Sequence, residues 1–183
     1  MTTTTLAHPR AGSDALFAQS ETRLREFTRS ELFARTFREG MELVEEAAAY
    51  LDGPGREDAR ALVTDAALIY ATQSMRLTTR LMQVASWLLV QRSLREGEMS
   101  VCEARDPKYR LVPETPTEGG LSFADIARHA HALPAILLDL MARSNSLYKR
   151  VSRLDRSLYA SIADQAGHTV ADQMARLAHA FDM

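Results

Sequence analysis

The sequence is poor in cysteine, glycine and proline: its 183 residues include one, eight and six of them. The single thiol, Cys102, excludes an internal disulfide and a cysteine-based zinc site. No apolar run approaches the ~18 residues that cross a bilayer. The threonine-rich start lacks the basic and apolar parts of a secretory signal. We therefore expect a cytoplasmic protein that does not contact a membrane.

Motifs for catalysis and nucleotide binding are also missing, including the phosphate-binding glycine loop, the nucleophile elbow and the zinc-binding HExxH pattern. A net charge of −2 gives no general attraction to nucleic acid. Four carboxylates, Glu39, Glu42, Glu45 and Glu46, would bind a metal or transfer protons only if they converged in a buried pocket. On an exposed helix face they form a solvated stripe. We therefore expect that the protein is not an enzyme and that it holds no cofactor or metal. The alternative is a metal site formed by these four carboxylates.

The first part of the chain predicts a lead-in and one helix. Residues 1–22 are expected to be disordered, because they are rich in threonine and have only scattered apolar positions. Thr28 and Glu31 have the spacing of a capping box, which predicts a helix start. Gly40 lies on the apolar face of this helix, where a neighbouring helix is expected to approach closely. The glycines and the proline of residues 52–55 end the helix and predict an antiparallel successor.

Residues 57–96 contain no glycine or proline and predict one long central helix that ends at Gly97. Its apolar residues follow two adjacent lines, so it is expected to contact more than one neighbour. One line contains Leu62, Ala66, Ile69, Gln73, Leu77, Leu81, Val84 and Leu88. The other contains Val63, Ala67, Tyr70, Ser74, Thr78, Met82, Ala85 and Leu89.

Three further segments complete the predicted organisation. Residues 97–121 are expected to form a long loop, and residues 134–160 a helix with a heptad seam. Residues 161–183 predict a flexible or weakly helical tail. The fold class is therefore all-α: an antiparallel three-helix bundle over residues 23–160, with a long central helix and flexible ends. Because the central helix outruns the first, its end near Trp87 needs cover, and a homodimer would supply it.

Charge is distributed unevenly along the chain. Residues 31–58 carry eight acidic and three basic residues, and residues 143–156 carry one acidic and five basic residues. These segments either pair with each other across the bundle or form two docking surfaces. Binding of phosphates by Lys149, Arg153 and Arg156 is a further alternative, but nucleic acid is not an expected partner, because no aromatic or glycine-rich residues accompany these three. The predicted partner-binding residues are Arg76, Arg80, Glu42, Glu46, Arg150 and Arg153, and the predicted dimer contacts are Met82, Trp87 and Leu88.

Two segments together resemble the alphaproteobacterial RcdA family of regulators of CtrA degradation. They are residues 37–56, FREGMELVEEAAAYLDGPGR, and residues 74–89, SMRLTTRLMQVASWLL. The resemblance covers residues 30–100 well and the heptad segment less specifically. It implies a homodimeric three-helix bundle without catalysis. It also implies delivery of cell-cycle regulators such as CtrA to the ClpXP protease, with CpdR-like and PopA-like partners, and recruitment to a cell pole.

The expected function is therefore that of a non-catalytic adaptor, which holds cargo at a protease and raises its effective concentration there. The alternative is a structural or regulatory helical dimer with no link to a protease. The sequence contains no residue that separates these two hypotheses, because neither requires a catalytic group.

Overall fold

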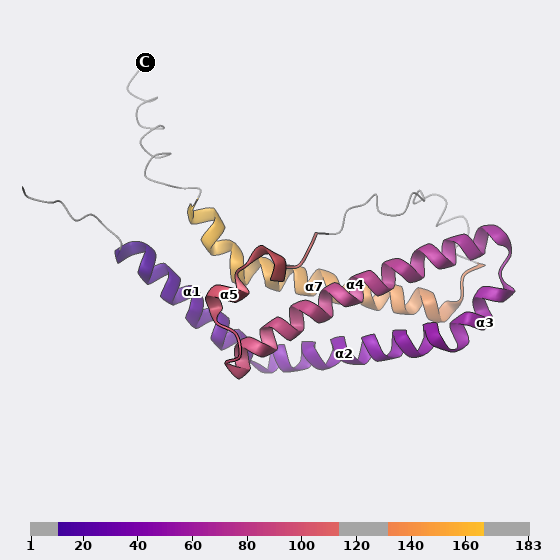
Figure 1. Ribbon diagram of the computed structural model, residues 1–183, viewed down its shortest axis with the longest axis horizontal. Helices are drawn as coiled ribbons and strands as arrows, with labels where there is room; N and C mark the ends of the chain where they lie inside the picture. Colours follow the sequence, from indigo (N-terminus) through magenta and orange to yellow (C-terminus); the bar gives the residue numbers. More distant parts are fainter. Residues whose placement is uncertain (1–10, 114–131, 167–183) are drawn as a thin grey trace, which may run out of the picture.

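The computed structural model describes the backbone of residues 11–113 and 132–166, and the side chains of residues 18–113 and 132–159. All regular elements in these ranges are helical, which confirms the all-α class (Figure 1). In chain order they are α1 (Ala11–Arg29), α2 (Glu31–Asp52), α3 (Pro54–Ala61), α4 (Thr64–Glu96), α5 (Val101–Ala104), the 3₁₀ helix η1 (Pro107–Tyr109) and α7 (Ala135–Ala166).

Helices α2, α4 and α7 lie side by side and form an elongated bundle (Figure 1). The connection around Gly53 is short, and α4 runs antiparallel to α2 as predicted. The third helix differs from the prediction, because α7 runs parallel to α4. Trp87 bonds to Asp155 and Gln91 bonds to Tyr159, so that residue numbers rise together along both helices. The long connection before α7 carries the chain back to the other end of the bundle, which a short loop could not do.

Helix α1 covers the end of α4 that outruns α2. Residues 11–22 were expected to be a disordered lead-in, whereas the structure places them in α1; residues 1–10 lie outside the described ranges. Leu24 of α1 is buried against Val101 and Tyr159. The ring of Phe27 lies 6.2 Å from that of Trp87, between centroids. The chain therefore covers this end of its central helix by itself.

The start of α2 is capped by Ser30 and not by the predicted Thr28. The Phe33 amide donates to the Ser30 hydroxyl at 3.2 Å. Thr28 lies inside α1, where its hydroxyl donates to the carbonyl oxygen of Arg25 at 3.0 Å. Either hydroxyl could accept a hydrogen bond from a backbone amide at a helix start. Ser30 is the cap because α1 ends and α2 begins at this position.

The predicted single helix over residues 57–96 is broken. Leu62 has extended backbone angles, and α4 begins after it at Thr64. Two tyrosine hydroxyls hold α3 in place: Tyr70 donates to the carbonyl oxygen of Gly55 at 2.8 Å, and Tyr50 donates to Asp58 at 2.9 Å. These contacts between helices require a turn at Leu62. No glycine or proline marks this turn in the sequence.

The core contains the predicted apolar line of α4 from Ala66 to Leu88 and the heptad seam of α7 from Leu137 to Val151, both buried. A Cβ at Gly40 would lie 2.5 Å from Leu88 Cδ1, which confirms the predicted close approach. The final turn of α4 ends at Gly97, whose φ of 79° is left-handed. The predicted C-terminal cap is therefore confirmed, since glycine adopts this conformation without a steric cost.

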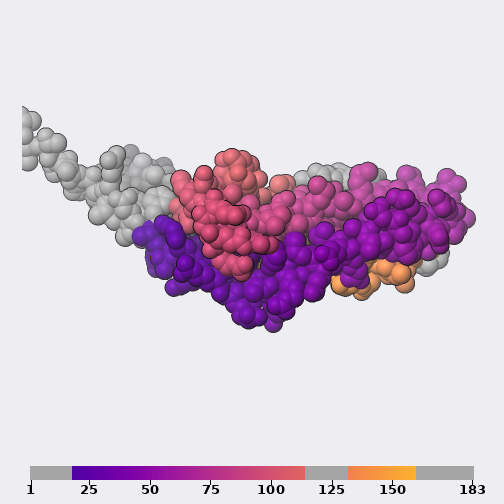
Figure 2. All heavy atoms as spheres, turned by 60° about the horizontal axis from the view of Figure 1, so that its bottom comes forward, coloured from indigo at the N-terminus to yellow at the C-terminus, as the bar shows by residue number. Residues whose placement is uncertain are grey.

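The segment after Gly97 is more ordered than the predicted loop. It contains α5 and η1, and it stands out from the α1 end of the bundle (Figure 2). Residues 114–121 of that predicted loop lie outside the described ranges, as do residues 167–183 of the predicted tail. Helix α7 continues to Ala166, beyond the predicted boundary at residue 160. No helix in the described ranges is both long and apolar enough to cross a membrane.

Candidate partner-binding surfaces

Helices α2 and α7 are joined by ion pairs along their exposed edge. Arg143 contacts Glu46 at 2.7 Å and Asp139 at 3.1 Å, and Arg150 contacts Glu39. The hydrogen bond from Arg143 lowers the pKa of the Glu46 carboxyl. The acidic and basic segments therefore pair within the chain, as the first alternative held. Glu46 and Arg150, which were predicted to bind partners, are held by these intramolecular contacts.

The other predicted partner-binding residues lie on different helices. Glu42 on α2 and Arg153 on α7 are exposed. Arg76 and Arg80 are half-buried on α4, and Arg80 donates to the Ser144 hydroxyl of α7 at 3.1 Å. The six residues thus do not form one site. Glu42, Glu46 and Arg153 face solvent, and Glu46 is paired with Arg143.

The acidic cluster of α2 does not form a metal centre in the structure. In the ranges that the structure describes, no three His, Cys, Asp or Glu side chains are grouped closely enough to hold a metal ion. Two of the four predicted carboxylates, Glu39 and Glu46, are each paired with an arginine of α7. The cluster therefore serves as one side of a contact between two helices.

Trp87 and Leu88 lie in the core of the chain, with 1% and 0% of their surface exposed. Their predicted role in a contact between two chains is therefore wrong. The indole N–H of Trp87 donates to Asp155 Oδ1 at 2.8 Å. A second chain was expected to cover the apolar end of α4. This end is instead covered by α1, by α7 and by the residues that follow α5. Met82 differs from these two residues, because 65% of its surface is exposed.

Asp155 joins three parts of the chain. It is 8% exposed, and Arg110 donates to both of its carboxylate oxygens, at 2.8 and 2.9 Å. The guanidinium of Arg110 also lies 4.1 Å from the centre of the Tyr159 ring. Burial raises the pKa of the Tyr159 hydroxyl. The sequence gives no signal for this cluster, because its members are far apart in the chain and follow no motif.

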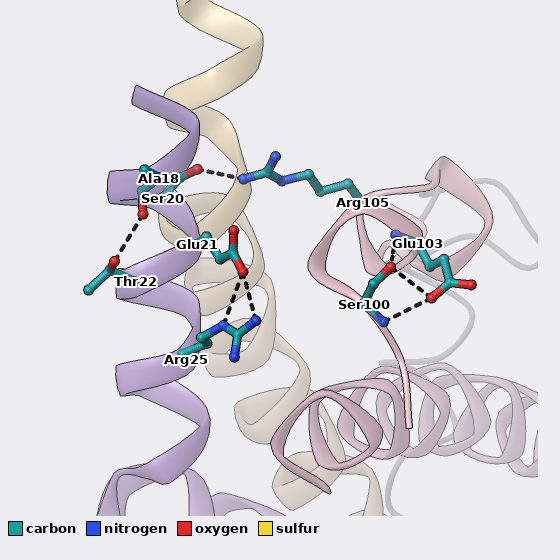
Figure 3. Close-up of polar contacts among 8 residues, drawn as sticks. All are labelled: Ala18, Ser20, Glu21, Thr22, Arg25, Ser100, Glu103 and Arg105. Atoms are coloured by element: carbon teal, nitrogen blue, oxygen red, sulfur yellow. Dashed lines mark hydrogen bonds and ion pairs between the residues drawn. The ribbon is translucent and has the colours of Figure 1, made fainter. Parts of the chain in front are cut away.

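The segment after α5 is tied to the rest of the fold at two further points. Arg105 donates to the Ser20 hydroxyl of α1 (Figure 3). Tyr148 of α7 donates to the Val112 carbonyl oxygen at 2.7 Å. Ser100 and Glu103 form a capping box at the start of α5, also drawn in Figure 3. These bonds hold residues 100–112 as a wall beside α4.

A hollow of about 410 Å³ lies between α4 and this wall. Its floor is largely apolar and includes Met82, Trp87 and Val90. The rim carries Lys108 and Arg110, both held by carboxylates: Lys108 by Asp106 at 3.1 Å and Arg110 by Asp155. The hollow offers space for an apolar side chain and no group arranged for catalysis.

The exposed face of α4 continues from this hollow. Leu68, Met75, Met82 and Leu89 are exposed by 62%, 71%, 65% and 49%, and they follow one another at intervals of seven residues. This interval was visible in the sequence. Met82 and Leu89 belong to the second apolar line predicted for this helix, whereas Leu68 and Met75 lie outside both lines, because steps of three and four describe buried faces.

Comparisons with known proteins identify relatives of the chain. Residues 24–181 match a family model described as a protein of unknown function, DUF1465. The crystal structure of RcdA from Caulobacter crescentus matches with 54% sequence identity and a TM-score of 0.59, and the match covers 74% of this chain and 98% of that chain. No curated protein matches. The chain therefore belongs to the RcdA family, described as DUF1465, as the resemblance of its two distinctive segments predicted.

Proposed function

We propose that the protein is a non-catalytic adaptor that helps to deliver cell-cycle regulators such as CtrA to the ClpXP protease in the cytoplasm, with CpdR-like and PopA-like partners. The observation that carries this proposal is the 54% identity to RcdA over 98% of that chain. At such identity, surface residues are shared as well as the core, so binding surfaces are expected to be shared too.

The architecture supports an adaptor in physical terms. The described residues form a rod in which ion pairs join α2 and α7, and the rod has separate exposed surfaces on α2, α4 and α7. An adaptor needs at least two such surfaces, because it acts by holding cargo and protease together. Two weak contacts on one rigid body then become one tight complex.

A reconstituted degradation assay tests the proposal. It combines the purified chain with ClpXP, the cognate CpdR-like and PopA-like proteins, cyclic-di-GMP and a CtrA-like substrate. We expect substrate loss to accelerate and to return to its basal rate when the chain is omitted. If all partners are active and the chain has no effect, the protein is instead a structural or regulatory helical dimer without a protease link.

Charge reversal at Glu42 and Arg153, both exposed, then tests where partners bind. We expect Glu42→Arg and Arg153→Glu to slow delivery severalfold, since each reverses a charge on an exposed surface. Their matched controls are Glu57→Arg and Arg60→Glu, which make the same changes at exposed positions of α3. If the two pairs of variants behave alike, Glu42 and Arg153 are not partner contacts.

A further inference from the structure

A row of three cations lies on the solvent-facing side of α7. Lys149, Arg153 and Arg156 are all exposed, and their steps of four and three place them on one side of the helix. At 1.5 Å per residue, the row is about 10 Å long. Among the side chains that the structure describes, no carboxylate is paired with any of the three. Arg156 bonds to the Ser152 hydroxyl at 3.5 Å, which leaves its charge unneutralised.

The other arginines of this part of α7 show that the helix can satisfy its charges within the chain. Arg143 and Arg150 are paired with Glu46 and Glu39 of α2. The acidic residue next to the row, Asp155, does not neutralise it, because that carboxylate is buried and bound to the segment that follows η1. The row is therefore a concentration of positive charge that the described part of the chain leaves to solvent.

Neither helix stability nor the helix dipole accounts for the row. Like charges at intervals of three and four residues repel each other, so Arg153 and its two neighbours in the row weaken α7 slightly. The dipole favours cations in the last turn of a helix, whereas α7 continues for ten residues beyond Arg156, to Ala166. A local arrangement that lowers the stability of its own helix is expected where it serves a function.

We propose that this row docks an acidic helical segment of a partner protein, whose carboxylates follow one another at the same steps of four and three. The inference rests on the proposed adaptor function and names the chemistry of one of its contacts. A helix alongside α7 can place one carboxylate against each cation, because both helices have the same rise and period. The guanidinium groups of Arg153 and Arg156 can each donate two parallel hydrogen bonds to a carboxylate, and Lys149 supplies a compact charge.

Small side chains around the row make this contact mainly electrostatic. Ala142, Ser146 and Ser152 lie on the same side of α7 and provide no large apolar group to anchor a partner. Exposed ion pairs contribute little individually, and salt screens them. We therefore expect a weak, salt-sensitive contact, which gains strength when a second contact on the same rigid body acts with it.

The surroundings of the row favour a protein segment over nucleic acid. Glu39 and Glu46 lie on the neighbouring edge of α2, and nearly half of each side chain is exposed. Duplex DNA carries one negative charge per about 1.7 Å of its axis, so it would bring further phosphates against these carboxylates. A protein segment presents a few carboxylates at fixed points, so it can match the three cations and avoid the two glutamates.

Binding of the purified full chain to each partner protein of the degradation assay tests the row. We expect Lys149→Gln/Arg153→Gln/Arg156→Gln to raise the dissociation constant for one partner about tenfold, since three charge pairs are lost. The affinity of that partner should also become less sensitive to salt. The variant should be at least as stable as the wild-type chain in urea, because the repulsion within the row is removed.

The matched control removes the same net charge at three exposed positions, one on each of α1, α2 and α3. It is Arg23→Gln/Arg38→Gln/Arg60→Gln. We expect this variant to change the dissociation constant less than about twofold, because its charges do not form a row. Equal losses in the two triple variants would reduce the effect to general attraction, and no loss with any partner would remove the docking site; either result overturns the proposal.

Zero-length cross-linking with a carbodiimide, which joins an amine to a carboxylate in direct contact, identifies the residues that meet. The chain has two lysines, Lys108 and Lys149. Lys108 is held by Asp106 at 3.1 Å, so its link should form within the chain. We expect Lys149 to be linked to an aspartate or glutamate of the partner. Lys149→Arg keeps the charge, so it should retain binding and lose this link. Links to the partner that never include Lys149 contradict the proposal.

The degradation assay separates failure of the row from failure of the adaptor function. If the wild-type chain accelerates substrate loss and the triple variant of the row does so equally, the row is not a docking site and the adaptor function stands. If the wild-type chain has no effect, the adaptor function fails, and the cross-linking at Lys149 decides the row by itself. A duplex DNA probe that binds the wild-type chain and not the triple variant would assign the row to nucleic acid and overturn the proposal.

Discussion

Asp155 links three elements at the α1 end of the bundle. It accepts hydrogen bonds from Trp87 of α4 and from Arg110 after η1, and it lies on α7. A buried carboxylate is stable only where its partners satisfy it, and these two donors do so. The polar cluster therefore orients three elements that apolar contacts alone would allow to slide.

Removal of the Asp155 carboxylate should leave two donors without a partner. We expect Asp155→Ala to lower the free energy of unfolding by about 2–3 kcal/mol. The loss stays below that of a fully buried pair, because 29% of the Arg110 side chain is exposed and can turn to water. Urea unfolding followed by the fluorescence of Trp87 measures it.

The matched control is Asp139→Ala, which removes another α7 carboxylate that is paired with an arginine. Asp139 is 61% exposed, and such surface pairs contribute less than about 1 kcal/mol. An equal loss in the two variants would show that Asp155 has no special structural role.

The two sides of helix α4 have different surroundings. One side packs against α2 and α7, and its end is covered by α1 and by residues 101–112. The remaining side carries the exposed apolar row of Leu68, Met75, Met82 and Leu89. At one of these contacts, Gly40 of α2 lets α4 approach closely.

At Gly40, α2 approaches α4 closely. In Gly40→Ala the new methyl group would lie 2.5 Å from Leu88 Cδ1, and Leu88 is fully buried. Overpacking costs about 1–3 kcal/mol, while the better helix propensity of alanine returns about 1 kcal/mol. We therefore expect a net loss of up to about 2 kcal/mol in urea unfolding.

The double variant Gly40→Ala/Leu88→Ala identifies the cause of that loss. If the methyl group clashes with Leu88, the double variant should be more stable than the sum of the two single changes predicts. Strict additivity would show that the contact is not the source of the cost.

The molecule as a whole is a rod with two unlike ends. At one end, α3 closes the turn between α2 and α4. At the other, α1, α5 and the end of α7 form a small separate core around Leu24, Val101 and Tyr159. This second core is small, so we expect it to open before the main bundle does.

Hydrogen exchange of Leu24→Ala tests this expectation. The cavity should weaken the α1 end by about 2–3 kcal/mol. Amides of α1 and α5 should then exchange faster, while those in the middle of α2 and α7 keep their protection. Leu32→Ala, at a 41% exposed position, should leave both regions unchanged. Uniform acceleration along the whole chain would show that the two cores unfold together.

The sequence by itself determined the features that depend on local pattern. The helical class, the buried line of α4, the heptad seam of α7, the close approach at Gly40 and the cap at Gly97 are all read from spacing and residue type, since one helix face repeats every three or four residues. Family membership is likewise contained in two contiguous segments. The acidic and basic segments could be read as complementary, but not as paired residues.

Only the tertiary structure decided features that depend on contacts between distant residues. Whether Ser30 or Thr28 caps α2 depends on where the chain turns, and the break after Leu62 depends on tyrosines of two other helices. The direction of α7 depends on where a long connection carries the chain. The burial of Trp87 depends on α1 and Asp155, which lie more than fifty residues away on either side. Apolar residues therefore show that a surface must be covered, and the three-dimensional arrangement decides what covers it.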